Sequence, residues 1–89
     1  MEITITKKSG NWTFGTVGGF SFEIKHFDEP SEFGIEDAES GIPGRISKLW
    51  ISRTWGEHWT VASYDRGWDK LPLTDNEIEA TNAVIDRFN

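Results

Sequence analysis

Large aromatic side chains alternate with basic ones along two segments that we expect to form β-hairpins. Aromatic rings interleaved with cationic groups can stack on bases, on sugars or on the side chains of a partner protein. Alternatively, the loop between the hairpins folds over these rings as a second small core, because large exposed apolar patches are uncommon in monomers. The candidate surface comprises Trp12, Phe14, Lys25, Lys48, Trp50, His58, Thr60 and Tyr64.

Two carboxylates and an arginine follow the second hairpin, at Asp65, Arg66 and Asp69. Two acids flanking a base could form a polar hook for a ligand. The same residues also fit a structural turn, in which Asp65 accepts amide hydrogen bonds and Gly67 takes the left-handed conformation. The sequence leaves both interpretations open.

Residues 28–44 form an irregular loop interrupted by proline and glycine, and residues 28–41 carry six acids and no base. The spacing lacks the alternating ligands and central glycine of an EF-hand. The loop is therefore either a solvated segment or an acidic surface that imitates a nucleic-acid backbone and blocks a basic groove on another protein. We expect Phe33, Ile35 and Ile42 to hold it against the domain.

Motifs for catalysis or metal binding are missing from the sequence. The chain has no cysteine, which excludes disulfides, thiolate metal sites and cysteine nucleophiles. Its two histidines, His26 and His58, do not have the spacing of a zinc site. No serine lies in a nucleophile elbow. We expect no catalytic residue, no metal and no cofactor, and the protein is predicted not to be an enzyme.

Length and charge narrow the class of protein further. The 89 residues suffice for one domain, and the net charge is −6. Residues 28–41 and 74–89 together carry −9, whereas the other segments carry +3. This balance disfavours nucleic acid as a partner and favours a protein. The lack of cysteine, of a signal peptide and of a long apolar run predicts a cytoplasmic protein without a membrane partner. The oligomeric state stays open.

Five strands are predicted from alternating side chains and turn residues. The Gly18-Gly19 pair suits a two-residue hairpin turn, which places Val17 opposite Phe20 and Trp12 on the face opposite Phe22. The predicted strands span residues 2–6, 12–17, 20–27, 45–53 and 57–64.

The register of the second hairpin depends on its turn. A three-residue loop at residues 54–56 would place Arg53 opposite Glu57, a favourable cross-strand pair. Leu49, Ile51, Trp59 and Val61 would then share one face. The other face would carry Ile46, Lys48, Trp50, Ser52, His58, Thr60, Ala62 and Tyr64.

The C-terminal segment has the signature of a helix over residues 75–88. Thr74 and Glu77 form a capping box, and Leu73 and Ile78 occupy the positions of a hydrophobic staple. An apolar stripe follows at helical spacing, made of Ile78, Thr81, Val84, Ile85 and Phe88. The predicted fold is therefore α+β, an antiparallel sheet of about five strands with this helix packed on one face.

Two motifs resemble a family of small proteins encoded by bacteriophages and prophages. They are GRISKLWI at residues 44–51 and YDRGWD at residues 64–69. The upstream segments at residues 20–31 and 33–35 are similar to the same family. The resemblance implies a viral accessory protein in the host cytoplasm, and it carries over no catalytic residue.

The sequence thus favours a non-enzymatic protein-interaction module, and the resemblance implies that this module is a phage-encoded acidic inhibitor of a host protein. The partner would be a host or viral protein. The alternative function is the binding of a small ligand or nucleotide on the aromatic and basic face of the sheet.

Overall fold

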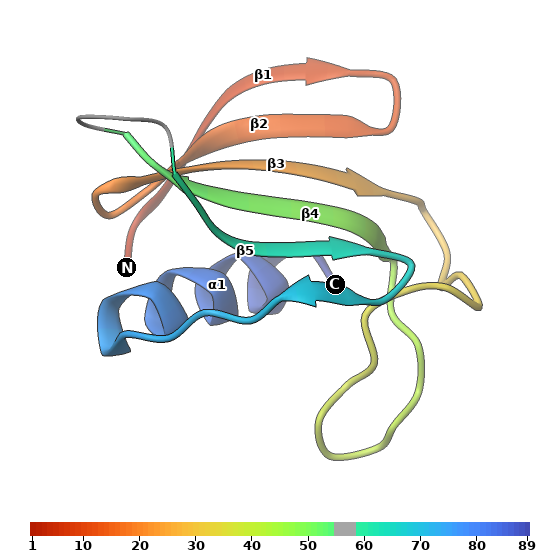
Figure 1. Ribbon diagram of the computed structural model, residues 1–89. Helices are drawn as coiled ribbons and strands as arrows, with labels where there is room; N and C mark the ends of the chain where they lie inside the picture. Colours follow the sequence, from red (N-terminus) through yellow and green to blue (C-terminus); the bar gives the residue numbers. More distant parts are fainter. Residues whose placement is uncertain (55–58) are drawn as a thin grey trace.

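A single antiparallel sheet with one helix against it makes up the fold (Figure 1). The computed structural model describes residues 1–54 and 59–89. The predicted α+β class is confirmed, but the sheet has six strands rather than five, paired in chain order. The elements are β1 (Ile3–Ser9), β2 (Trp12–Val17), β3 (Phe20–His26), β4 (Ile46–Arg53), β5 (Thr60–Asp65), β6 (Trp68–Lys70) and α1 (Asp75–Phe88).

The first two hairpins follow the sequence closely. Val17 pairs with Phe20 and Trp12 pairs with Lys25, as the Gly18-Gly19 turn predicts. β1 continues to Ser9, past its predicted end at residue 6, because its polar second half still pairs with β2 across a bulge. β6 was not predicted, since three exposed residues after a tight turn are too few to show an alternating pattern.

The predicted register of β5 is wrong. Leu49 pairs with Tyr64, whereas the three-residue turn would have placed Leu49 opposite Val61. This offset of three residues is odd, so it turns the side chains of β5 to the other face. Tyr64 therefore lies with Leu49 on the helix side and is only 7% exposed. The prediction that Tyr64 shares a face with Trp50 is wrong.

The start of β5 also differs from the sequence prediction. Trp59, expected in the core beside Leu49, is 56% exposed, and the Arg53 guanidinium lies 5.8 Å from its ring centre. A bulge between Ile51 and Ser52 changes the register at this end of the hairpin. The predicted partner of Arg53, Glu57, lies outside the described residues, as does His58.

The core fills the space between the sheet and α1. Val17, Phe22, Ile24, Leu49 and Ile51 are buried from the sheet. From the helix, Ala80, Val84 and Phe88 pack against them, and the Phe22 and Phe88 ring centres are 5.6 Å apart. Within the part of the chain that is described, no helix is long and apolar enough to cross a membrane.

The helix has the bounds and the cap that were predicted. The Thr74 side chain accepts the Glu77 N–H at 3.2 Å, and the Glu77 carboxylate accepts the Thr74 N–H at 3.3 Å. The predicted staple is wrong, because Leu73 is 80% exposed and Ile78 is exposed too. Ala80 takes the place of Ile78 in the buried stripe, so the face that packs on the sheet is rotated from the predicted one.

The acidic loop at residues 28–44 lies on the helix side of the sheet (Figure 1). The Tyr64 hydroxyl donates to the Phe33 carbonyl oxygen at 2.9 Å and lies 3.1 Å from the Gly34 carbonyl oxygen. The side-chain amide of Asn89, which caps the helix end, donates to the Ile35 carbonyl oxygen at 3.0 Å. The alternative that this loop covers Trp12 is therefore wrong.

Only one of the three apolar side chains expected to hold this loop is buried. Ile35 is 2% exposed, whereas Phe33 and Ile42 are exposed. Backbone hydrogen bonds supply the remaining attachment, with the Gly44 N–H donating to the Ile35 carbonyl and the Ile35 N–H donating to the Ile46 carbonyl. The loop is thus fixed by hydrogen bonds more than by apolar burial.

The turn after β5 uses Arg66, not Gly67, as its left-handed residue. Arg66 has a φ of 61°, so the predicted role of Gly67 is wrong. The Arg66 N–H donates to the Ser47 carbonyl oxygen at 3.2 Å. Its guanidinium lies 5.2 Å from the Phe33 ring centre. These tertiary contacts hold Arg66 in a conformation that costs a non-glycine residue about 1–2 kcal/mol.

The Tyr64→Phe variant tests the loop anchor. It should lower the free energy of unfolding by about 1–2 kcal/mol, because a buried carbonyl loses its donor. Hydrogen exchange at the amides of Ile35 and Gly44 should accelerate. Urea denaturation and amide exchange would measure the two effects, with Ser63→Ala, on the other face of β5, as the control. Unchanged exchange would contradict the anchoring role.

The Glu77→Gln variant tests the cap through pH. The N–H groups of Leu73 and Thr74 and the Arg53 guanidinium, 3.4 Å away, hold the pKa of Glu77 below its ordinary value of 4.5. Ionised Glu77 therefore stabilises the fold above that pH, and the contribution is lost as the pH falls through the lowered pKa. The stability difference between the wild type and Glu77→Gln should be largest at neutral pH and should shrink in acid. Glu79→Gln, an exposed position on the same helix, controls for net charge; a difference independent of pH would refute the assignment.

Candidate functional site

A row of aromatic rings crosses the face of the sheet opposite the helix. The ring centres of Trp12 and Trp50 are 6.0 Å apart with planes inclined by 21°, and those of Trp12 and Phe14 are 6.3 Å apart at 26°. Trp12 and Phe14 come from β2 and Trp50 comes from β4, so the rings meet above β3. All three are half-buried. We call this the aromatic row.

Lysines surround the aromatic row. The Lys7 ammonium lies 5.8 Å from the Phe14 ring centre, within reach of a cation–π contact. Lys25 and Lys48 are direct cross-strand neighbours on β3 and β4. Lys48 also forms an ion pair with Asp65, with Nζ and Oδ1 3.7 Å apart. Like charges opposite each other disfavour the sheet, so this corner of the face suits an anionic group.

Hydroxyl side chains fill the other end of the same face. The pairing of the strands places them on the side of Trp50, and they are Thr16, Ser21, Ser52, Thr60 and Ser63. A shallow depression of about 540 Å³ lies between three of these hydroxyls (Ser21, Ser52 and Thr60) and the rings of Trp12 and Trp50. Glu23, the cross-strand neighbour of both Phe14 and Trp50, also lines it and places one carboxylate on this face. We call the aromatic row, its lysines and these hydroxyls the open face.

The structure brings together five of the predicted site residues. Trp12, Lys25, Lys48 and Trp50 lie on the open face, and Asp65 joins them through its ion pair with Lys48. Tyr64 does not belong there, for the reason given above.

The predicted hook of two acids and an arginine is not formed. Asp65 pairs with Lys48, and the Arg66 guanidinium lies over Phe33 instead of between the two acids. Asp69 is exposed on β6. The turn therefore serves to attach β5 and the acidic loop to each other.

The sequence pattern placed Ser52 and Thr60 on this face but missed Lys7, Thr16, Ser21 and Ser63. Lys7 lies past residue 6, the predicted end of the first strand, because three consecutive polar residues at 7–9 show no alternating pattern. The hydroxyls carry no motif of their own, and only the pairing of β2 through β5 collects them. Neither omission could have been corrected without the register of the sheet.

His26 lies outside this face and has a structural role. Its Nε2 is 3.0 Å from the Thr13 hydroxyl, and its ring centre is 5.5 Å from that of Phe88. Burial, together with the nearby Arg45 and Lys8, lowers the pKa of His26. Among the described residues, no group of three acidic or histidine side chains could hold a metal ion.

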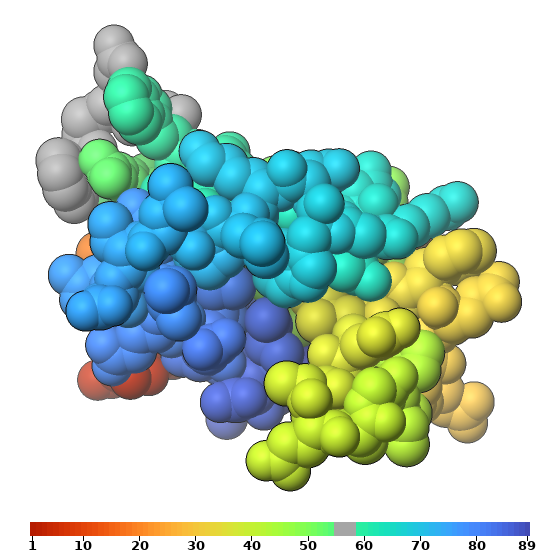
Figure 2. All heavy atoms as spheres, turned by 60° about the horizontal axis from the view of Figure 1, so that its bottom comes forward, coloured from red at the N-terminus to blue at the C-terminus, as the bar shows by residue number. Residues whose placement is uncertain are grey.

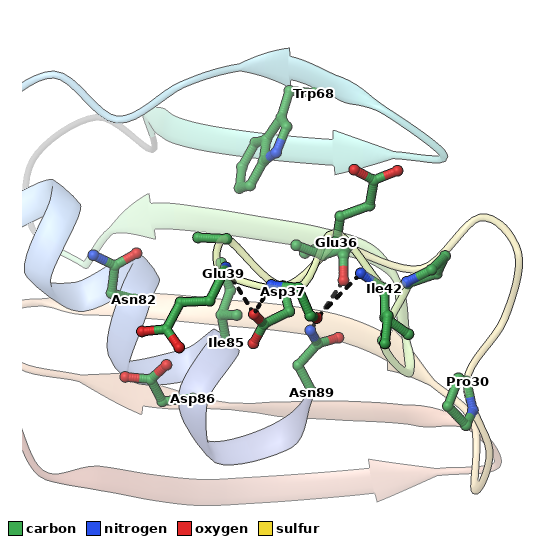
Figure 3. Close-up of a pocket in the computed structure, with 15 residues that line it drawn as sticks. Pro30, Glu36, Asp37, Glu39, Ile42, Trp68, Asn82, Ile85, Asp86 and Asn89 are labelled. Atoms are coloured by element: carbon green, nitrogen blue, oxygen red, sulfur yellow. Dashed lines mark hydrogen bonds between the residues drawn. The ribbon is translucent and has the colours of Figure 1, made fainter.

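A hollow of about 730 Å³ lies on the helix side, between the acidic loop, β6 and the end of α1 (Figure 3). It is larger than the depression on the open face. Its walls combine exposed apolar side chains, among them Trp68 and Ile42, with the carboxylates of Glu36, Glu39 and Asp86. Lysines thus lie only on the open face of these two sites, whereas the described residues that line the hollow carry carboxylates and no base.

Comparison with known proteins identifies the family but no relative of known activity. The model of a family described as Domain of unknown function (DUF7678) matches residues 11–89. The chain belongs to this family. The match includes the aromatic row, the acidic loop and α1, whereas β1 lies outside it. No curated protein matches the chain. No solved structure matches it either.

Paired variants on β4 test which face is the core. Trp50 and Ile51 are adjacent and point to opposite faces. Ile51→Ala should cost about 2–5 kcal/mol of unfolding free energy, as for a buried aliphatic side chain. Trp50→Ala should cost only about 1–2 kcal/mol, because its ring is half-buried and mainly loses contacts with Trp12. Urea titrations would measure both, and an equal loss would mean that the open face is a second core.

Proposed function

We propose that this protein is a non-enzymatic protein-interaction module that binds its partner through the open face. The observation that carries the proposal is the aromatic row, which neither α1 nor the acidic loop covers. Tryptophan and tyrosine rings with a polar surround are the usual centres of binding energy in protein interfaces. Here Trp12, Phe14 and Trp50 would form the centre, and the lysines and hydroxyls would form the rim.

The charges of the open face favour a partner segment that carries carboxylates. Lys25 and Lys48 repel each other across the sheet, and Asp65 pairs with Lys48 alone, so a partner carboxylate beside Lys25 would relieve the remaining repulsion. A long nucleic acid would extend beyond this small basic area. Its phosphates would then be repelled by the rest of the protein, whose net charge is −6. A protein partner avoids this conflict because its charge can vary along its surface.

The resemblance to phage and prophage proteins supports a more specific role within this proposal. A small phage-encoded protein without catalytic residues would act by occupying a surface of a host protein and blocking it. The partner would then be a host protein, and the site of action would be the host cytoplasm. Phage origin, inhibition and this location are parts of the proposal.

Affinity capture from the lysate of a bacterial host would test the proposal. Bait carrying Trp50→Ala should lose the protein that wild-type bait captures, while remaining folded by circular dichroism. Leu73→Ala is the matched control, because it removes an exposed apolar side chain away from the open face. Binding of the purified partner would then be measured by calorimetry. Equal capture by all three baits would contradict binding through the open face.

A second candidate function is the binding of a nucleotide or other small anion on the same face. The opposed lysines beside the Trp12 and Trp50 rings favour it, because a phosphate could lie between Lys25 and Lys48 while a base stacks on a ring. Titration of intrinsic tryptophan fluorescence with a panel of nucleotides separates the two functions. Saturable quenching that Lys48→Ala abolishes would support the nucleotide; the protein-interaction proposal predicts none.

A further inference from the structure

The hollow on the helix side has the composition of a binding site for a cationic side chain. Figure 2 shows this side of the molecule, with the acidic loop as a lobe beside the dark blue end of α1. The loop contributes Ile42, which is 63% exposed, and β6 contributes Trp68, which is 39% exposed. α1 contributes Ile85 and Asn89. Three separate elements thus build one apolar concavity.

The carboxylates of the hollow are available to a ligand. Asp37 is not among them, because its Oδ1 accepts the N–H groups of Glu39 and Ser40 at 2.8 and 2.9 Å. These bonds lower the pKa of Asp37 and shape the loop tip. Glu36, Glu39 and Asp86 are exposed and form no ion pair with any described residue. Of the described residues that line the hollow, none is basic.

The positions of the side chains around the hollow suit a long cationic ligand. Trp68 reaches toward it from β6, and Asp86 borders it from α1 on the far side (Figure 3). An elongated cationic side chain could lay its aliphatic stem on Ile42 and Ile85 and its charged end against the carboxylates. The face of an exposed tryptophan adds a cation–π contact of about 0.5–1 kcal/mol.

We propose that this hollow binds an arginine or lysine side chain presented by an extended, otherwise apolar segment of a partner protein. The site lies on the other side of the sheet from the open face, so it is independent of the function proposed above. Its carboxylates and exposed apolar side chains specify the occupant, since a neutral polar segment would leave the carboxylates without a counter-charge. A protein with both sites could hold two surfaces of one partner or bridge two partners.

Nuclear magnetic resonance of the ¹⁵N-labelled full chain would test the proposal. The probe is a blocked tripeptide with arginine between two leucines, and the control probe has glutamine in place of arginine. The arginine peptide should shift the indole N–H of Trp68 and the side-chain amides of Asn82 and Asn89 in a saturable manner. The glutamine peptide should bind at least several-fold more weakly.

Matched variants distinguish a specific site from general attraction to an acidic protein. The Glu36→Gln/Asp86→Asn variant should weaken binding by about two- to fivefold for each carboxylate removed, as for exposed ion pairs. Glu29→Gln/Glu32→Gln removes the same number of charges, both from the part of the acidic loop outside the hollow, and should bind as the wild type does. Trp50→Ala should also leave peptide binding intact, which separates this site from the open face.

Three outcomes would overturn the proposal. The first is the absence of a saturable shift with the arginine peptide, and the second is equal binding of the glutamine peptide. The third is self-association in analytical ultracentrifugation that both the hollow variant and Lys48→Ala abolish, because the occupant would then be the basic face of a second copy. A spectrum of each variant without peptide establishes that it is folded.

Discussion

The hydrogen bond from the buried Tyr64 hydroxyl to the acidic loop is the constraint on which this architecture depends. The ring of Tyr64 packs in the core and its oxygen reaches the Phe33 and Gly34 carbonyls. Burial raises the pKa of Tyr64, with Glu36 adding to the effect, so the phenol stays protonated to a higher pH than an exposed tyrosine does. One side chain therefore fixes both the face that β5 presents to the helix and the side of the sheet on which the loop lies.

The end of the helix reinforces the same arrangement. Asn89 accepts the Ile46 N–H through its Oδ1 and donates to the Ile35 carbonyl, and the Arg45 guanidinium donates to the Phe88 carbonyl at 2.9 Å. Gly44 lies against the Asn89 side chain so closely that a β-carbon would overlap it. Helix, loop and β4 therefore form one hydrogen-bonded unit. Because these hydrogen bonds hold the loop on the helix side of the sheet, it cannot also cover Trp12 and Trp50.

The consequence is a domain with two unlike faces. Lysines and hydroxyls surround the aromatic row on one side, while carboxylates border an apolar hollow on the other. The acidic side chains gather on one side because the acidic segments of the chain are the loop and the helix. The loop lies on the same side of the sheet as the helix.

Local sequence determined a substantial part of this structure. The glycine pair set the register of β2 and β3, and the capping box set the start of α1. The alternation of side chains placed Trp12 on the face of the sheet opposite the core residues Phe22 and Ile24. Each of these features depends on residues that are near one another in the chain. Their physical causes, backbone conformation at a turn and hydrogen bonds within four residues, are visible in a short window of sequence.

The tertiary structure alone decided the face of Tyr64, the existence of β6, the left-handed conformation of Arg66 and the side on which the loop lies. Tyr64 and Phe33 are distant in sequence, as are Arg66 and Ser47, and contacts between such residues leave no periodic signal. A side chain on a strand has two possible faces, and a bulge or an odd change of register exchanges them. The predicted turn favours one register of β4 and β5. The observed register differs from it, because it buries Tyr64 and allows its hydrogen bonds to the loop.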